Sequence, residues 1–366
     1  MATLADPATR FTRVPHPAPT PAQDRAAILE NPGFGNRFTD HMVMIEWSEA
    51  AGWHNPTVQP YGPIALDPAA SVLHYAQEIF EGLKAYRHPD GSMALFRPEA
   101  NAARFNASAR RLAMPELPDD LFIAAIQELV AVDKDWFPTV EGGSIYLRPF
   151  MIATEAFLGV RPAKAYKFLV IASPAGNYFK SGAPAVSIWV SDYTRAAPGG
   201  TGAAKCGGNY AASLVPTAEA FAKGHDQVLF LDAAEHRWIE ELGGMNLFFV
   251  HADGSLATPA LSGTILAGVT RDSLIRLARD EGLTVREDRY SLDQWRADAQ
   301  SGALVEVFAC GTAAVVTPVG QVADHTGSFT IGSGGPGQLT SKLKARLTAI
   351  QRGEEPDPHG WVMRLG

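Results

Sequence analysis

The order of strand-like and helical segments in the first half of the chain most constrains its fold. The strand-like segments are residues 41–47, 82–88, 92–97, 144–154 and 166–172. Pro89-Asp90-Gly91 separates two of them and predicts a hairpin. Helical patterns occupy residues 98–112 and 119–136. Because strands and helices are grouped and do not alternate as βαβ units, this half is expected to have an α+β fold.

The length of 366 residues favours two domains. Residues 1–36 contain six prolines and predict an extended N-terminal arm. We expect a small α+β domain over residues 37–173, an interdomain linker rich in Pro and Gly at 174–182, and a large domain over 183–366. In the large domain, a helix is expected over about 209–223, and Pro216 should kink it.

The composition excludes several classes of protein. The formal net charge is −8, whereas a nucleic-acid-binding protein needs a basic surface. We find no apolar run of roughly 18 residues and no secretory signal in the first 25 residues, so we expect no membrane association. Cys206 and Cys310 are the two cysteines, which favours a reducing compartment. We therefore expect a cytoplasmic protein that binds neither nucleic acid nor membrane.

Lys205 is the first candidate for chemistry. It lies in the Gly-rich segment 198–208, with no charged residue within five positions on either side. A phosphate-binding P-loop would need Gly before the lysine and Ser or Thr after it, but Ala204 and Cys206 stand there. Small uncharged neighbours favour a desolvated lysine, whose lowered pKa makes the amine a nucleophile.

Other segments are weaker candidates for sites. Glu241 runs into Leu242-Gly243-Gly244 and an apolar strand, so its carboxylate is expected to meet a specific partner. Glu235, His236, Glu240 and Glu241 lack metal-ligand spacing, so no metal site is predicted. Residues 332–337 match the dinucleotide fingerprint formally, but too few residues follow, which favours a connecting loop. The glycine turn before Thr270 could offer backbone N–H groups to an anion.

An ordered set of motifs extends from about Phe38 to Gln351. The motifs are Leu73-His74-Tyr75, Phe80-Glu81-Gly82-Leu83-Lys84-Ala85-Tyr86, Tyr146-Leu147-Arg148-Pro149, Lys205-Cys206-Gly207-Gly208-Asn209-Tyr210, Glu241-Leu242-Gly243-Gly244-Met245-Asn246 and Gly311-Thr312-Ala313. Together they resemble the class IV pyridoxal-phosphate enzymes, specifically the branched-chain amino-acid aminotransferases. The resemblance implies a fold-type IV enzyme with a small α+β domain and a larger pseudo-barrel α/β domain.

The same resemblance implies pyridoxal 5′-phosphate as cofactor and a homodimer as assembly. Lys205 resembles the lysine that holds the cofactor covalently and later moves the proton at the substrate Cα. Glu241 resembles the carboxylate beneath the pyridine nitrogen, and Tyr210, beside Asn209, would bind the phenolic oxygen. The implied phosphate ligands are Arg104, Val269, Thr270 and Thr312.

The implied reaction is transamination of L-leucine, L-isoleucine and L-valine with 2-oxoglutarate. The residues implied to line the substrate pocket are Phe38, Tyr75, Phe80, Tyr146, Tyr210 and Ala313. Leu158 and Val160 match loop residues contributed by the partner subunit. Arg148 shares a strand face with Tyr146 and is expected to meet the distal carboxylate of glutamate.

Other functions remain open from the sequence. D-amino-acid aminotransferase and aminodeoxychorismate lyase share the fold, and the aromatic set and the 311–313 turn favour the branched-chain interpretation. A cofactor-free metabolite-binding protein would have lost Lys205 or Glu241, yet both are present. Gly244 stands where some members carry Thr, so one hydroxyl near the cofactor is missing.

Overall fold

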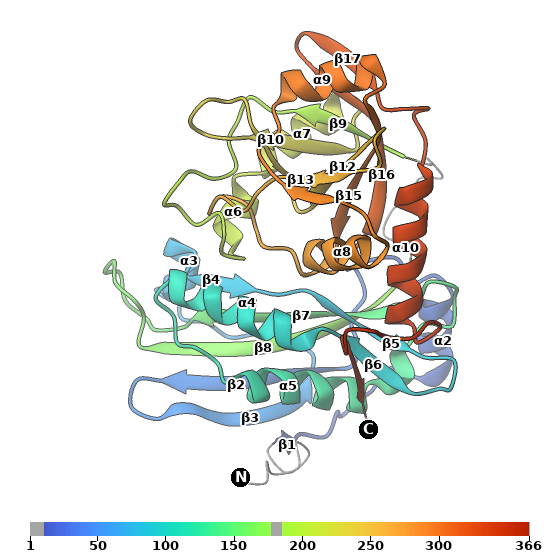
Figure 1. Cartoon of the computed structure of the whole chain (residues 1–366). Coiled ribbons are helices and arrows are strands. Elements are labelled where there is room, and N and C mark those ends of the chain that lie inside the picture. The colour runs from blue at the N-terminus through green and yellow to red at the C-terminus, as the bar shows by residue number, and fades with distance from the viewer. Residues whose placement is uncertain (1–10, 177–184, 366) are drawn as a thin grey trace. The chain divides into compact units, whose positions relative to one another are not determined.

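The computed structural model describes residues 11–176 and 185–365 and divides into two compact units (Figure 1). Unit 1 comprises Met1–Tyr178 and Gln351–Gly366, and unit 2 comprises Phe179–Ile350. Within the described residues, no helix is long and apolar enough to cross a membrane.

Among the described residues, unit 1 is built on one nine-stranded sheet that is antiparallel except for β1 and β3. In sheet order the strands are β1 (Thr12–Arg13), β3 (Gly52–Pro60), β2 (His41–Ser48), β8 (Ala165–Ala175), β7 (Ser144–Ala153), β5 (Leu83–Arg87), β6 (Met93–Phe96) and β18 (Val362–Leu365), and β4 (Glu78–Phe80) also pairs with β7. The expected hairpin is β5 and β6, which pair antiparallel across residues 88–92.

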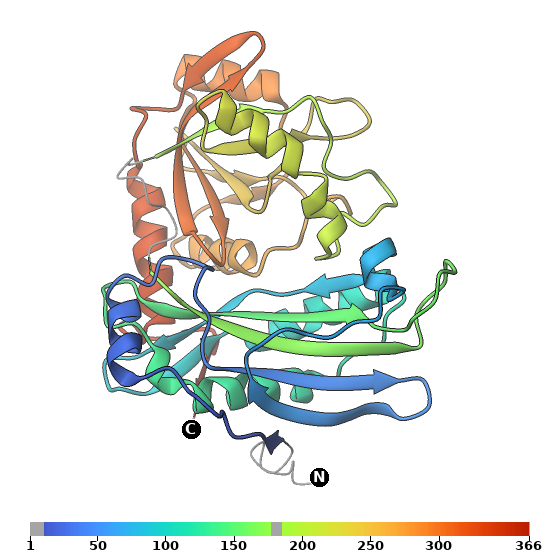
Figure 2. The ribbon, with the colours of Figure 1, turned by 180° about the vertical axis from the view of Figure 1, so that it is seen from behind.

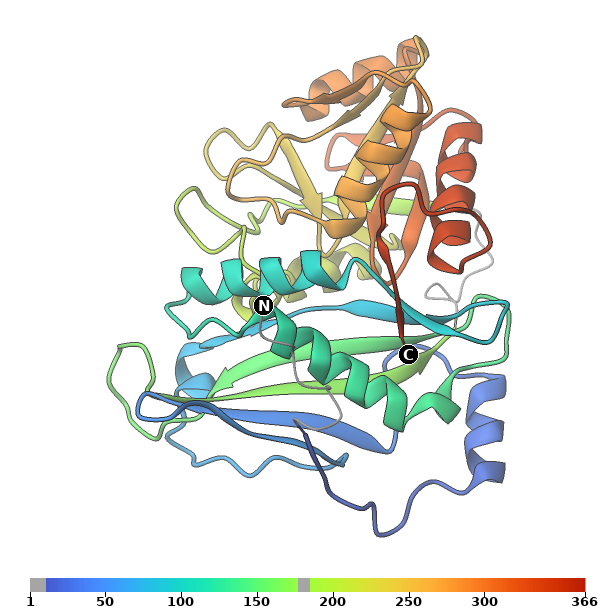
Figure 3. The ribbon, with the colours of Figure 1, turned by 60° about the horizontal axis from the view of Figure 1, so that its bottom comes forward.

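Two helices cover one face of this sheet, α4 (Pro98–Arg111) and α5 (Asp119–Val132), and Figure 3 shows them side by side. Phe105 of α4, Phe122 of α5 and Phe168 of β8 form a buried cluster with ring centroids 5.4 to 5.8 Å apart. α4 and α5 each present an apolar stripe at helical spacing. α5 packs on β2 and β8, and α4 packs on α5 and β4, so these contacts form the core of unit 1. The α+β prediction for this half is confirmed.

The prediction of an extended arm over residues 1–36 is wrong for part of its length. Residues 1–10 lie outside the described residues, and Ala22–Glu30 forms helix α2. Pro21 directly precedes α2, a place where its missing N–H costs no helical hydrogen bond. The prolines therefore delimit a helix here, whereas the sequence interpretation treated them as a sign of extended chain.

The C-terminal segment belongs to unit 1, which differs from the expected large domain over 183–366. Helix α10 (Gln338–Gln351) ends at the division between the units, and β18 then pairs antiparallel with β6. The rings of Trp361 and Phe96 stand 5.6 Å apart, edge to face, beside that pairing. The linker was expected to begin at residue 174, but β8 continues to Ala175. Residues 177–182 of the expected linker lie outside the described residues.

Unit 2 has a second nine-stranded sheet among the described residues. In sheet order the strands are β11 (Ile239–Leu242), β10 (Gln227–Leu231), β9 (Val186–Val190), β16 (Val315–Asp324), β15 (Leu304–Gly311), β12 (Asn246–His251), β13 (Leu256–Thr258) and β14 (Val285–Glu287), and β17 (Gly327–Thr330) pairs with β16. The two ends of this order meet, since Trp238 bridges to Ser291 and the N–H of Ile239 donates to the Tyr290 carbonyl. The sheet is therefore curled, as the pseudo-barrel prediction requires.

Five helices accompany this sheet in the described part of unit 2. They are α6 (Gly207–Ala211), α7 (Leu214–Ala222), α8 (Val269–Asp280), α9 (Leu292–Ser301) and α10. Figure 2 shows α6 and α7 as two successive helices, and α7 packs on β10. The predicted kink at Pro216 is wrong, because the chain starts a new helix at Leu214 and Pro216 falls in its first turn.

The glycines at 332–337 form the connection that leads into α10. The carboxylate of Glu306 accepts the N–H groups of Leu339 and Thr340 at 3.1 and 2.8 Å, and the Thr340 hydroxyl at 2.8 Å. A Cβ at Gly337 would lie 1.8 Å from the carboxylate carbon of Glu306. Glycine is therefore required where a carboxylate from β15 caps the helix, which explains the motif without a nucleotide.

We expect Glu306→Ala to lower the free energy of unfolding by about 1–2 kcal/mol, because two N–H groups at the start of α10 lose their acceptor. Urea unfolding of the two proteins measures this difference. Glu354→Ala, at an exposed position after the helix, is the matched control and should change little. Equal stability of the Glu306 variant and the wild type would contradict the capping role.

Candidate active site

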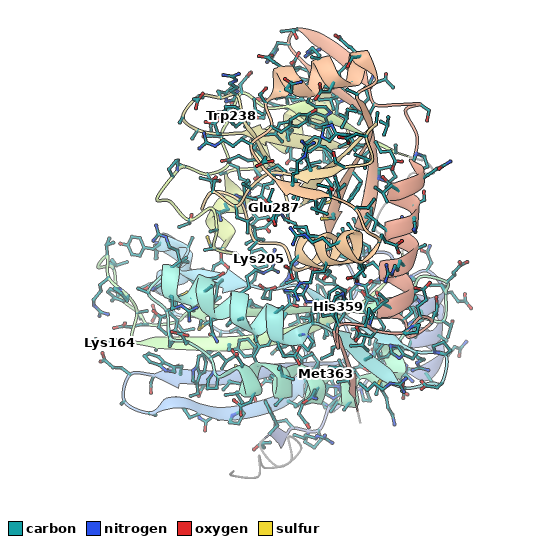
Figure 4. The ribbon with its side chains drawn as sticks, in the orientation of Figure 1. Lys164, Lys205, Trp238, Glu287, His359 and Met363 are labelled. Carbon is teal, nitrogen blue, oxygen red and sulfur yellow. The ribbon has the colours of Figure 1, made fainter. Side chains whose placement is uncertain are left out.

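The loop before α6 presents Lys205 next to Tyr210, and Figure 4 labels the lysine in unit 2. The Lys205 Nζ donates to the Tyr210 Oη at 2.8 Å. Asn209 fixes the loop, since its Nδ2 donates to the carbonyl oxygens of Thr201 and Ala204, both at 2.9 Å. The short helix α6 thus holds the amine and the phenol together, and Asn209 supports the loop instead of facing a ligand.

Glu241 lies on β11 and is 3% exposed. Its Oε1 lies 3.0 Å from the Nη1 of Arg195 and accepts the N–H of Leu266 at 3.0 Å. Burial raises the pKa of Glu241 to about 7, while the charges of Arg195 and Lys205 act to lower it. A buried carboxylate with this pKa is suited to meet a cationic ring nitrogen, which would restore its charged form.

Arg195 was not singled out from the sequence. It is the only charged residue between Asp192 and Lys205, and in the structure its side chain is 3% exposed. A lone arginine in an uncharged segment ahead of the lysine loop was the signal available. The sequence could not identify its partner, because Glu241 lies on β11, far along the chain.

The other expected cofactor residues of unit 2 converge on the same end of the sheet. Asn246, which starts β12, pairs with Cys310, two residues before Thr312. A Cβ at Gly268 would lie 2.1 Å from the Asn246 Oδ1, so the start of α8 lies against the same residue. Gly268 is the N-cap of α8 and offers no side chain to the first N–H groups, those of Val269 and Thr270.

Tyr210 also approaches this region, because a Cβ at Gly244 would lie 3.8 Å from its ring. The hydroxyl that a threonine would supply at position 244 is therefore missing next to the ring of Tyr210. An amine, a phenol, a buried carboxylate and a helix start are together the groups that a phosphorylated pyridine aldehyde needs. Among the described residues, no group of three or more His, Cys, Asp or Glu side chains is placed to hold a metal ion.

Arg104 lies in unit 1, on α4, and is held by Glu81. Its Nε and Nη2 donate to the two carboxylate oxygens of Glu81 at 2.7 and 2.8 Å, and Asn101 donates to the same group at 2.7 Å. Glu81 is fully buried, so the pair is rigidly oriented. Glu81 therefore acts as the positioning partner of Arg104, a role that the sequence analysis did not assign.

Phe80, Tyr146 and Arg148 also meet in unit 1. The Arg148 guanidinium carbon lies 4.9 Å from the Phe80 ring centroid and 5.5 Å from that of Tyr146. Its Nη2 reaches the Tyr146 hydroxyl only at 3.4 Å, and its buried Nε has no hydrogen-bond partner within the described residues. The expected shared face of residues 146 and 148 is observed. This cluster pairs apolar aromatic walls with an unmet cationic donor.

The remaining expected pocket residues are spread over three places. Phe38 stacks on Tyr61 with ring centroids 4.9 Å apart, and the Tyr75 hydroxyl donates to the Leu158 carbonyl at 2.6 Å. Leu158 and Val160 are 68% and 86% exposed. Ala313 lies in the β15–β16 turn of unit 2.

The structure therefore groups the expected residues into two sets. Unit 2 brings together Lys205, Tyr210, Glu241, Val269, Thr270, Thr312 and Ala313. Unit 1 holds Arg104, Phe38, Tyr75, Phe80, Tyr146, Arg148, Leu158 and Val160.

Comparison with known proteins gives concordant matches. A family model described as amino-transferase class IV matches residues 78–322. A branched-chain-amino-acid aminotransferase of Mycolicibacterium smegmatis is 59% identical over 352 residues, covering 94% of this chain and 96% of the relative. The structure of the branched-chain amino acid aminotransferase of Escherichia coli has a TM-score of 0.74 and 28% identity, covering 88% of this chain and 99% of that chain. A T.th. branched-chain amino acid aminotransferase complexed with N-(5′-phosphopyridoxyl)-L-glutamate has a TM-score of 0.71 and 30% identity, covering 88% and 98%.

The raised pKa of Glu241 predicts a pH-dependent stability of the cofactor-free protein. The folded state binds a proton more tightly than the unfolded chain, so this contribution is complete below about pH 4.5 and is lost as pH rises through about 7. At about 1.4 kcal/mol per pKa unit, the loss is a few kcal/mol.

The measurement is urea unfolding of the cofactor-free wild type and Glu241→Gln between pH 5 and pH 8. The stability of the wild type relative to the variant should fall as pH rises. Glu219→Gln, at an exposed position on α7, is the matched control and should show a constant difference. A constant difference for Glu241→Gln as well would contradict the raised pKa.

Proposed function

This chain belongs to the class IV aminotransferase family, and from that premise we propose that it transfers the amino group of L-leucine, L-isoleucine and L-valine to 2-oxoglutarate. The products are the branched-chain 2-oxo acids and L-glutamate. The identity to relatives with this activity in their names supports the substrate class. The observation that carries the proposal is the Phe80–Tyr146–Arg148 cluster, which joins apolar walls to an unmet cationic donor.

Class IV aminotransferases use pyridoxal 5′-phosphate, which supplies a carbonyl that accepts the amino group and a ring that accepts electrons. In our proposal Lys205 carries this cofactor covalently. Its amine, when free, would act as the base and acid that removes and returns the proton at the substrate Cα. The Tyr210 hydroxyl would donate a hydrogen bond to the oxygen on the cofactor ring, and the Lys205 Nζ, which donates to the same hydroxyl at 2.8 Å, lies beside it.

Glu241 would hold the proton on the ring nitrogen. Its carboxylate is buried, so water screens its charge less than at the surface. Arg195 balances that charge at 3.0 Å and keeps the carboxylate in place. Arg195 is therefore a positioning residue for Glu241.

We assign the phosphate to Arg104, to the N–H groups of Val269 and Thr270, and to the Thr312 hydroxyl. The start of α8 supports this assignment, because a helix N-terminus without a side-chain cap attracts an anion. The bidentate contact with Glu81 supports it as well, because it fixes the plane of the Arg104 guanidinium. The Ala313 N–H would meet the α-carboxylate of the substrate.

One pocket must accept both branched apolar side chains and the acidic side chain of glutamate. Phe38, Tyr75, Phe80 and Tyr146 would form the apolar wall. An unpaired carboxylate buried there would cost several kcal/mol or more, so it needs a cationic partner. The buried Nε of Arg148, which has no hydrogen-bond partner in the described part of the chain, is that partner in our proposal, and the Tyr146 hydroxyl at 3.4 Å assists.

We further propose that the enzyme is a homodimer in the cytoplasm. Leu158 and Val160 are exposed in the single chain, and an apolar loop tip of this kind fits a role in the pocket of a second copy. Both cysteines are free and buried, in keeping with a reducing compartment.

Amino-donor profiling with 2-oxoglutarate tests the function. We expect L-leucine, L-isoleucine and L-valine to be donors and D-leucine to be inactive. Activity with D-leucine, or formation of 4-aminobenzoate from aminodeoxychorismate, would favour the other enzymes of this fold. Borohydride reduction followed by peptide mapping should place the cofactor on Lys205, and Lys205→Ala should lose turnover while the matched variant Lys223→Ala retains it.

Arg148→Met tests the recognition of both substrates. Loss of the cation should slow the glutamate half-reaction by roughly 30-fold or more, because the distal carboxylate would be buried unpaired. The leucine half-reaction should change little, since it uses the apolar wall. Stopped-flow measurement of each half-reaction separates them, and Arg364→Met, at an exposed position, is the control. Equal losses in both halves would reject this role.

Val160→Glu tests the assembly. A charge at the exposed loop tip should weaken the dimer and lower activity in parallel, because it would be buried in the partner's pocket. Sedimentation velocity and activity measured over a dilution series follow both effects. Val14→Glu, at another exposed valine of unit 1, is the control. A fully active monomer would contradict the proposed sharing of the site.

A further inference from the structure

Unit 2 contains a cavity with a volume of about 250 Å³ at the seam where the ends of the curled sheet meet. It is lined by the β10–β11 turn, the start of β11, the segment between β13 and α8, and by Pro198 and Arg289 from two further loops. Its chemically distinctive lining residues are Trp238, Glu240, Pro259, Thr264, Ile265 and Arg289. Figure 4 shows Trp238 in a different part of unit 2 from Lys205.

Glu240 forms the buried acidic wall of this cavity. It is 6% exposed, and because side chains alternate along a strand it faces away from the side of Glu241. Among the described residues, the one hydrogen bond it accepts comes from the Thr264 hydroxyl. A carboxylate has about four acceptor positions, so most of its capacity is unmet. Burial raises the pKa of Glu240, which a bound cation would reverse.

Trp238 also lines this cavity, and its indole carries an unmet donor. Its indole Nε1 is buried and has no hydrogen-bond partner within the described residues. The exposed guanidinium of Arg289 lies 5.7 Å from its ring centroid. An indole N–H can only donate, so the group that satisfies it must carry an acceptor oxygen.

The other two acids of the lining do not compete for these roles. Asp232 accepts four backbone N–H groups of its own turn, at 2.8 to 3.1 Å, and its pKa is held at about 2. It is thus a structural group that closes the β10–β11 turn. Glu235 is exposed to solvent at the rim. The lining of the cavity therefore contains the buried carboxylate of Glu240 and, separately, the indole N–H of Trp238 beside the guanidinium of Arg289.

We propose that this cavity is a second ligand site that binds a small apolar L-amino acid as its zwitterion. The ammonium group donates to Glu240, and the carboxylate accepts the Trp238 N–H and faces Arg289. The apolar side chain packs on Pro259 and Ile265. A ligand with only an amine would leave the indole N–H without an acceptor. A ligand with only a carboxylate would be repelled by the Glu240 carboxylate, so both groups are needed.

The site is connected to the catalytic carboxylate through Thr264. The Thr264 hydroxyl bonds Glu240, and its carbonyl accepts from the Arg195 Nη1 at 3.1 Å. The same Nη1 lies 3.0 Å from Glu241. An amino acid whose ammonium group binds Glu240 therefore influences Arg195, the partner of Glu241, through two contacts: Glu240 with Thr264, and Thr264 with Arg195. This regulatory consequence rests on the proposed function, whereas binding at the cavity does not.

Calorimetric titration of the borohydride-reduced holoenzyme with L-valine tests the binding site. Reduction keeps the cofactor covalently on its lysine, so turnover does not contribute. Isobutylamine and isobutyrate, which each lack one of the two charged groups, should bind about tenfold more weakly or worse. Absence of L-valine binding tighter than about 10 mM would overturn the proposal.

Variants locate the binding. Trp238→Phe keeps an aromatic ring and removes the donor, so it should weaken L-valine binding about tenfold. Glu240→Gln should weaken L-valine binding at least as much. The control is Trp53→Phe in unit 1, where the indole N–H donates to the Glu116 carbonyl, and this change should leave L-valine binding unaffected. Undiminished binding in both Trp238→Phe and Glu240→Gln would place the ligand elsewhere and reject the site.

Donor profiling of the same variants separates the two proposals, because loss of binding with a normal donor profile supports the second site and leaves the proposed function intact.

Discussion

The buried ion pair between Arg195 and Glu241 organises the candidate site of unit 2. Both side chains are 3% exposed, and a carboxylate buried without a partner would cost several kcal/mol. The same guanidinium donates to the Thr264 carbonyl, and Glu241 also accepts the N–H of Leu266. The pair thereby ties the segment before the lysine loop to β11 and to the approach to α8. Loss of the pair would loosen three chain segments that are distant in sequence.

Two chain segments also approach their neighbours so closely that no side chain fits between them. This explains why glycine stands at two positions whose backbone dihedrals do not require it. A Cβ at Gly202 would lie 2.5 Å from the Thr264 carbonyl, and one at Gly268 would lie 2.1 Å from the Asn246 Oδ1. Neither glycine has a positive φ, so absence of a side chain is the requirement at both. The loop of Lys205 and the start of α8 can therefore lie against the same group of strands, which brings amine, carboxylate and helix terminus together.

Much of this could be predicted from the sequence, because local signals carried it. Helices α4 and α5 follow apolar periodicity and begin at the expected positions, and the β5–β6 hairpin follows its turn residues. Lys205 stood out through the lack of charge around it, and Glu241 through the apolar strand that follows. The ordered motifs then identified the family, which the family model and the relatives bear out.

Tertiary structure decided whatever depends on segments that are far apart in the chain. The local pattern showed no sign that β18 would leave unit 2 and pair with β6, or that the ends of the second sheet would meet at Trp238 and Ser291. The partners of buried charges were equally hidden: Arg195 for Glu241, and Glu81 for Arg104. The sequence by itself determined which residues are candidates for the chemistry. Their partners followed only from burial, because a charge removed from water takes whichever opposite charge the fold brings within reach.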